Sequence, residues 1–153
     1  MKTRASTLTA GILLAATIAG FSQSTLQFTA TSYTVAESAG SVSLVVQRVG
    51  DTNPIVGVDY AAVDGTATNG LKYLAVSGTL AFAAGETNKV IVVPILDEGF
   101  VEGIKYFRVI LTNPTGGAIL GTCTKVAVTI TDNDVGVQVE FNTYYVAEDA
   151  GLC

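Results

Sequence analysis

Carboxylates are the side chains in this sequence whose number and spacing could do chemistry. The chain has 13 acidic residues, and seven of them follow the predicted ends of hydrophobic segments. These seven are Glu37, Asp64, Asp97, Glu98, Glu102, Asp132 and Asp134. Histidine is absent, which excludes Ser-His-Asp and Cys-His catalysis and histidine-ligated zinc. Oxygen donors without nitrogen donors favour a hard cation such as Ca²⁺.

Paired carboxylates could also hydrolyse glycosidic bonds, and Asp97 with Glu102 is the pair to consider. That chemistry needs two carboxyl groups about 5–10 Å apart across a substrate cleft. Such clefts are usually lined by aromatic side chains, and Phe100 is the aromatic residue near this pair. We therefore predict that the chain is not an enzyme.

Alternating apolar and polar residues predict strands throughout residues 25–135. In residues 124–131, Val126, Val128 and Ile130 alternate with more polar neighbours, as in a strand with one face in a core. Seven strands are expected, the first of them kinked, at 26–28 with 33–36, 42–49, 55–63, 78–82, 89–96, 104–111 and 124–131. Seven strands over this length predict an all-β fold, an antiparallel immunoglobulin-like β-sandwich.

The alternating direction of these strands brings the seven acids together. The ends of the first, third, fifth and seventh strands lie at one end of a sandwich, and all seven acids follow those ends. We call this end the acidic pole; the opposite pole carries only Asp51 and Glu86. Two unit charges about 4 Å apart repel by roughly 4 kcal/mol at an effective dielectric constant of 20. A bound Ca²⁺ would offset that repulsion, and the alternative is a solvated acidic rim without a specific ion.

Residues 1–24 have the pattern of a secretory signal peptide. Lys2 and Arg4 precede an apolar run that is too short to span a membrane. Small residues suited to cleavage follow as Gly20 with Ser22, or Ser22 with Ser24. We therefore expect a secreted or cell-surface protein. The net charge of -5 disfavours nucleic acid and anionic lipid as partners.

A near-repeat links the two ends of the chain. YTVAESAG at 33–40 returns as YYVAEDAG at 144–151, an offset of about 111 residues, which is the size of a whole domain. We therefore interpret residues 25–135 as one module and residues 136–153 as the truncated start of a second. Cys123 and Cys153 could pair in an oxidising compartment, and the alternative is a free, buried Cys123.

Several short motifs, in this order and spacing, resemble the Calx-β domain family. They are VAE at 35–37, VDY at 58–60, DGTA at 64–67, GTL at 78–80, ILDE at 95–98, FRV at 107–109 and VTITDND at 128–134. The resemblance covers about residues 26–135. It implies a sandwich like the regulatory domains of sodium–calcium exchangers, with Ca²⁺ bound at the acidic pole.

Carried over by position, the ligands of that family would be all seven acids named above. This sequence departs from the family at Gly99, Gly103 and Lys105, where calcium-binding members have denser acidic runs, and at Lys72, where the family often has Asp. Lys105 could replace one ion by an internal salt bridge. We expect one or two sites with dissociation constants of about 10⁻⁴–10⁻³ M.

The function expected from these features is an exported Ca²⁺-binding module that stiffens the junction between tandem repeats of a surface or adhesion protein. Its expected partners are neighbouring Calx-β repeats, and then other surface proteins or glycans. Membrane association is expected only through parts of a longer protein outside this chain. The alternative is a structural extracellular spacer without a specific Ca²⁺ site.

Overall fold

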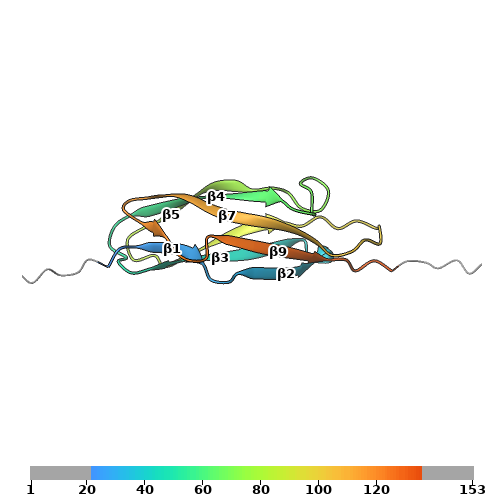
Figure 1. Ribbon diagram of the computed structural model, residues 1–153, viewed down its shortest axis with the longest axis horizontal. Coiled ribbons are helices and arrows are strands. Elements are labelled where there is room, and N and C mark those ends of the chain that lie inside the picture. The colour runs from blue at the N-terminus through green and yellow to red at the C-terminus, as the bar shows by residue number, and fades with distance from the viewer. Residues whose placement is uncertain (1–21, 136–153) are drawn as a thin grey trace, which may run out of the picture.

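The computed structural model describes residues 22–135 and forms a sandwich of two β-sheets (Figure 1). The four-stranded sheet has the order β6-β3-β1-β8, and the five-stranded sheet has the order β2-β9-β7-β4-β5. The elements are β1 (Thr25–Phe28), β2 (Ser32–Ala36), the 3₁₀-helix η1 (Glu37–Ala39), β3 (Ser41–Val49), β4 (Val56–Asp64), β5 (Ser77–Phe82), β6 (Asn88–Pro94), β7 (Lys105–Thr115), β8 (Ile119–Leu120) and β9 (Lys125–Thr131).

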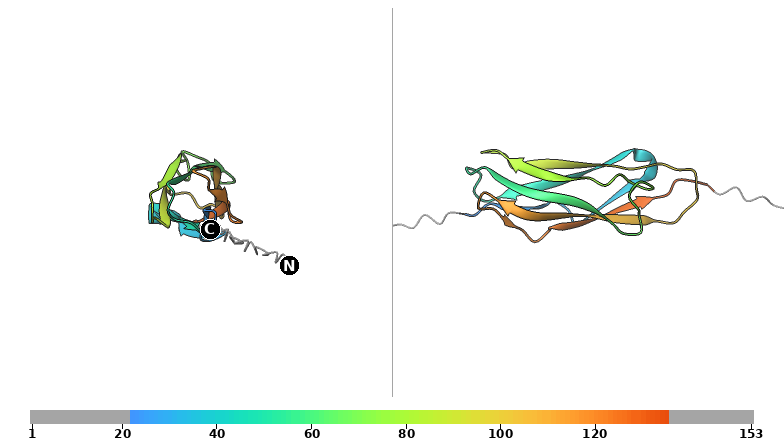
Figure 2. Two further views of the ribbon diagram at one scale, coloured as in Figure 1. Left: turned by 90° about the vertical axis from the view of Figure 1, so that its left-hand side faces the viewer. Right: turned by 90° about the horizontal axis from the view of Figure 1, so that it is seen from above.

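The core lies between the sheets and is built by the alternation that the sequence shows. In β3, Val42, Leu44 and Val46 are buried while their neighbours face outward, and β9 does the same with Val126, Val128 and Ile130. Aromatic rings fill the centre, with Phe28, Phe82, Phe107 and Tyr73 all buried. Figure 2 shows the ribbon of this sandwich from one end and from above. The predicted all-β, immunoglobulin-like sandwich is therefore confirmed.

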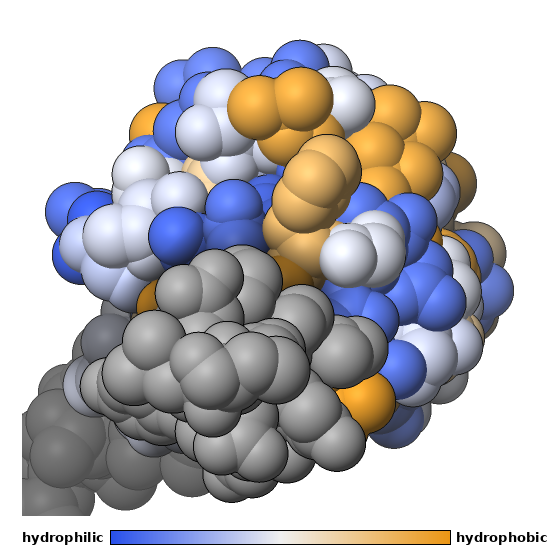
Figure 3. All heavy atoms as spheres, turned by 90° about the vertical axis from the view of Figure 1, so that its right-hand side faces the viewer, coloured by the Kyte–Doolittle hydropathy of each residue, from blue (hydrophilic) through white to orange (hydrophobic). Residues whose placement is uncertain are grey.

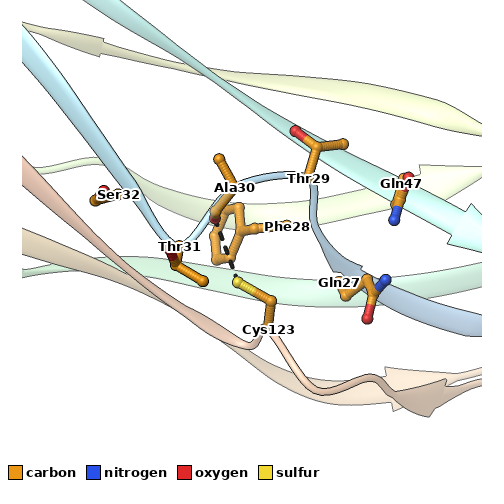
Figure 4. A pocket seen from close by; sticks show the side chains of 8 residues that line it. All are labelled: Gln27, Phe28, Thr29, Ala30, Thr31, Ser32, Gln47 and Cys123. Atoms are coloured by element: carbon orange, nitrogen blue, oxygen red, sulfur yellow. Dashed lines mark hydrogen bonds between the residues drawn. The ribbon is translucent and has the colours of Figure 1, made fainter.

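The first predicted strand is divided between the two sheets. β1 pairs antiparallel with β3 in one sheet, and after residues 29–31 the chain crosses to the other sheet, where β2 pairs parallel with β9. Figure 4 shows this crossover, with Cys123 beneath it donating a hydrogen bond from Sγ to the carbonyl oxygen of Ala30 at 3.2 Å. Cys123 is half-buried and free among the described residues. Its pairing with Cys153 lies outside residues 22–135 and stays a prediction.

Two further details differ from the sequence-based expectation. A two-residue strand, β8, pairs parallel with β1, so the sheets are not purely antiparallel. The sequence did not predict β8 because two residues are too few to show the alternation of apolar and polar residues. β7 continues beyond the predicted strand end at 111, through Pro114 to Thr115, so the following turn begins at Gly116. The register against β4 shifts between Gly57 and Asp59, and a bulge of this kind admits proline in a central strand.

Most of the predicted leader at 1–24 and the predicted second module at 136–153 lie outside the described residues. Residues 22–24 are described, and Ser24 is buried beside β1. Among residues 22–135, no helix has the length and apolar character needed to cross a membrane.

Candidate metal centre

The parallel pairing of β2 with β9 places two acidic segments side by side at the acidic pole. The last pair of this ladder joins Ala36 to Thr131, so Glu37 in η1 and Asp132 follow directly from paired residues. Figure 3 shows this end of the molecule, where hydrophilic and apolar side chains are intermixed. A parallel ladder thus brings together residues that are 95 positions apart in the numbering of the chain.

Among residues 22–135, one group of carboxylates has the geometry of a metal site. Glu37, Asp132 and Asp134 each offer an oxygen, and these three oxygens lie within 4.8 Å of one another. Backbone amides hold the group in place: Asn133 N donates to Glu37 Oε1 at 3.2 Å, and Asp134 N donates to Asp132 Oδ1 at 2.7 Å. Glu102 N donates to the other oxygen of Asp132. The β6–β7 loop is therefore tied to the same group.

Burial and mutual repulsion set the charge state of this group. Burial raises the pKa of Glu37, which is 2% exposed, and the carboxylates of Asp132 and Asp134 raise it further, against the Asn133 N–H. The N–H groups of Asp134 and Glu102 lower the pKa of Asp132. Without a cation, Glu37 therefore holds a proton more readily than Asp132 does.

The residues of this group fit a hard cation. Asp134 Oδ2 is buried without a hydrogen-bond partner in the described part of the chain, and a buried carboxylate oxygen left in this way is costly. A cation would satisfy it. All the side-chain donors are carboxylate oxygens, and they come from two segments, η1 and the segment after β9. This arrangement suits the flexible geometry of Ca²⁺ better than the strict octahedron of Mg²⁺.

The buried Lys72 pairs with two acids of the β6–β7 loop, Glu98 and Glu102. Lys72 Nζ pairs with Glu98 Oε1 and lies 2.7 Å from Glu102 Oε2, and its side chain is only 9% exposed. Lys105 Nζ is 3.3 Å from the same oxygen of Glu102. These two ammonium groups, Lys72 first, lower the pKa of Glu102. A protein cation therefore occupies the space between Glu98 and Glu102.

Tyr73 fixes the position of Lys72. The Tyr73 ring stacks on Phe107 with centroids 4.0 Å apart and an interplanar angle of 6°. Leu96 N donates to Lys72 O at 3.0 Å, which joins this loop to the end of β6. The sequence shows Lys72 as a departure from the family, but its contact with Glu98 joins two loops, and no local pattern predicts it. Sequence reasoning named Lys105 as the internal cation, and Lys72 makes the more extensive contacts.

The structure does not bring Asp64 or Asp97 into the group of three. Asp64 Oδ1 accepts hydrogen bonds from Tyr73 Oη at 2.6 Å and from Asn69 N at 3.0 Å, so this carboxylate holds the loop after β4. Burial and the Asp64 carboxylate raise the pKa of Tyr73, so its hydroxyl stays a donor. Asp97 is exposed. Of the seven predicted ligands, three converge, two pair with lysine and two stand apart.

An immunoglobulin-like sandwich with a carboxylate group between η1 and the segment after β9 defines a class of small binding domains. Residues 22–134 match the family model of the Calx-beta domain, and the chain belongs to this family.

Curated relatives contain this domain within much longer proteins. The chain is 38% identical over 136 residues to mouse Extracellular matrix organizing protein FRAS1, covering 84% of this chain and 3% of that protein. It is 38% identical over 104 residues to zebrafish Adhesion G-protein coupled receptor V1, covering 68% and 2%. It is 32% identical over 144 residues to human Sodium/calcium exchanger 3, covering 79% and 16%. The chain thus spans a small part of each of these relatives.

Solved structures with the same fold include calcium-binding domains of Calx. The crystal structure of the apo-form Calx CBD1 domain superposes with a TM-score of 0.71 at 29% identity, covering 73% of this chain and 99% of that one. The calcium binding domain CBD12 of CALX1.1 superposes with a TM-score of 0.69 at 30% identity, covering 71% and 44%. The second structure is therefore more than twice as long as the segment it shares with this chain.

Proposed function

We propose that this chain is an exported, non-enzymatic Calx-β module that binds Ca²⁺ at Glu37, Asp132 and Asp134. The observation that carries the proposal is the convergence of three carboxylate oxygens within 4.8 Å. One of these residues, Asp134, has a buried oxygen that no group within residues 22–135 hydrogen-bonds. The likeness to domains described as calcium-binding supports it. The names of the matrix and adhesion relatives support placement at a cell surface or in a matrix.

We propose one ion at this centre, held with an affinity in the predicted range. Lys72 already supplies positive charge to Glu98 and Glu102, so a second cation beside them would have to displace a buried ammonium group. Fewer carboxylates per ion give weaker binding, and Ca²⁺ sites of extracellular modules have dissociation constants of about 10⁻⁴–10⁻³ M. Of the other four predicted ligands, Glu98 and Glu102 pair with Lys72, and Asp64 holds the loop after β4.

The ion would act by joining segments. Glu37 follows β2, Asp132 and Asp134 follow β9, and Glu102 N links the β6–β7 loop to Asp132. A cation bound by the three carboxylates would restrain all of these segments at the point where the chain leaves the sandwich. Only Val135 separates Asp134 from the predicted start of the next repeat at residue 136. Ca²⁺ would therefore stiffen the junction between repeats.

Exposed apolar residues at the same pole support a neighbouring repeat as the partner. Phe100 is 71% exposed, Val101 58% and Ile104 69%, all in the loop that leads from β6 to β7. Side chains of this kind gain free energy when a partner covers them. We propose that the next repeat covers this loop and that Ca²⁺ fixes the angle between the two modules.

Thermal unfolding of the protein tests the Ca²⁺ site. We expect 10 mM Ca²⁺ to raise the melting temperature relative to EDTA, and 10 mM Mg²⁺ to raise it much less. The double variant Asp132→Asn, Asp134→Asn should lose the rise, whereas Asp97→Asn, an exposed acid of the same pole, should keep it. An equal melting temperature in Ca²⁺ and EDTA would leave the structural spacer as the function.

A further inference from the structure

Residues 22–24, which precede the first strand, are built into the domain. Ser24 is 3% exposed, and its carbonyl oxygen accepts a hydrogen bond from Ile119 N at 2.9 Å. Its hydroxyl donates to Asp51 O and accepts from Arg48 Nη2 at 3.0 Å and Nε at 3.3 Å. Ser24 therefore connects the start of the chain to β8 and to the turn after β3.

Arg48 makes this serine important to the fold. Arg48 is 3% exposed, and its guanidinium donates to Pro54 O at 2.7 Å, to Asp51 O at 3.1 Å and to Ala83 O at 3.4 Å, besides Ser24. A buried guanidinium needs acceptors for its donors, because an unsatisfied buried charge is costly. The Ser24 hydroxyl receives two of these contacts.

The neighbouring turn is shaped to receive the same segment. Gly50 has φ 95°, and a Cβ at this position would stand 2.4 Å from Gln23 O. Asp51 N donates to Ser22 O at 2.9 Å, and Gln23 Nε2 donates to Gly117 O at 2.9 Å. Residues 23 and 24 are thus packed and hydrogen-bonded at the pole opposite the acidic pole.

The sequence offers two cleavage positions preceded by suitably spaced small residues, and they differ in what they leave on the domain. Hydrolysis after Ser24, with Ser22 and Ser24 as the small residues, would remove the Ser24 hydroxyl. It would also place the new ammonium group of Thr25 next to the Arg48 guanidinium. Hydrolysis after Ser22, with Gly20 and Ser22 as the small residues, keeps Gln23 and Ser24. This second cut removes only the hydrogen bond from Asp51 N to the carbonyl oxygen of Ser22. Ser22 is exposed, so Asp51 N can donate to water instead.

We propose that the leader is removed at the bond between Ser22 and Gln23, so that the mature chain begins at Gln23. The inference rests on the proposed export of this chain. The peptidase adds water across this bond, which leaves a carboxylate on Ser22 of the leader and an amine on Gln23 of the domain. The folded domain then retains every hydrogen bond of Arg48.

Tandem mass spectrometry of the full chain, exported by a bacterial host, reads the new N-terminus, whether or not Gln23 has cyclised with loss of ammonia. A terminus at Gln23 supports the proposal. A terminus at Thr25 overturns it while leaving export intact, and a terminus at any other residue overturns the assigned bond. A chain that keeps its leader overturns both the bond and the export on which it rests.

Two variants and one melting experiment sharpen the test. Gly20→Phe should block the cut between Ser22 and Gln23, because it fills a small-residue position for that cut but not for the cut after Ser24. A terminus at Gln23 in this variant would contradict the proposal. The matched control Ala19→Phe should be processed normally. A chain starting at Thr25 should melt about 6–12 °C below one starting at Gln23, since it loses hydrogen bonds to a buried charged group. Equal melting temperatures would contradict the proposal.

Discussion

Replacing Glu37 by glutamine tests two effects of the acidic group separately: the loss of stability that it causes without Ca²⁺ and the stabilisation that it allows with Ca²⁺. Because the pKa of Glu37 is raised in the folded domain, this side chain binds a proton more tightly there than in the unfolded chain, where the reference pKa of a glutamate is 4.5. By linkage, stability without Ca²⁺ falls as pH rises from the unfolded pKa to the folded one. The uncharged amide removes this dependence and can still accept from Asn133 N and donate to Asp132. In EDTA at pH 7, Glu37→Gln should therefore melt at a higher temperature than the parent protein.

Calcium should reverse this order. With a dissociation constant of about 0.1–1 mM, 10 mM Ca²⁺ stabilises the folded state by about 1.4–2.7 kcal/mol, because the gain is RT ln(1 + [L]/Kd). In a domain of this size about 4 °C of melting temperature corresponds to 1 kcal/mol, so the parent protein should gain about 6–11 °C. The variant has lost one of three carboxylates and should gain less than about 2 °C.

Differential scanning calorimetry at pH 4, 5, 6 and 7, in EDTA and in Ca²⁺, measures both effects. Without Ca²⁺, the two proteins should converge near pH 4, where Glu37 is protonated in both states. Glu86→Gln, at the opposite pole, is the matched control and should retain the full response to Ca²⁺. A variant that is less stable than the parent protein in EDTA at pH 7, or that responds to Ca²⁺ as strongly as the parent, would refute this account of the site.

Two further substitutions test the groups around the centre. Lys72→Gln removes the buried ammonium group and leaves the Glu98 and Glu102 carboxylates without it. This variant should melt several degrees lower than the parent protein in EDTA, and isothermal titration calorimetry should show a second bound Ca²⁺. An unchanged stoichiometry would count against the role of Lys72. Tyr73→Phe keeps the stacked ring but removes the hydrogen bond to Asp64, so urea unfolding should show a loss of about 1–2 kcal/mol with an unchanged response to Ca²⁺. A lost Ca²⁺ response would show that Asp64 acts at the centre after all.

The strands could be predicted because their signal is local. Val126, Val128 and Ile130 alternate with outward-facing residues, and this period alone locates β9 to within one residue. The kink in the first strand was also visible in the sequence. Its consequence, the parallel pairing of β2 with β9, was not, because nothing local specifies which sheet a strand joins after a crossover.

The acidic pole could be predicted in outline and not in detail. Counting alternating strands is enough to place Glu37 and Asp132 at one end of the sandwich. Their contact depends on the parallel ladder, and the assignment of all seven acids as ligands stays a prediction. Lys72 lies in a loop without periodicity, and the adjacent Tyr73 stacks on Phe107, which is 34 positions away. Long-range packing of this kind leaves no local pattern.

The division of the first strand between two sheets has a consequence for how the module bears force. The described chain enters at one end of the sandwich and leaves at the other (Figure 1), so tension along a tandem array would pull the terminal strands along their own length. β2 and β9 are parallel, and the five residue pairs between them would be loaded together in shear rather than opened one after another. At the end of this ladder lie the carboxylates of Glu37, Asp132 and Asp134. A cation bound there would resist the sliding of β2 along β9.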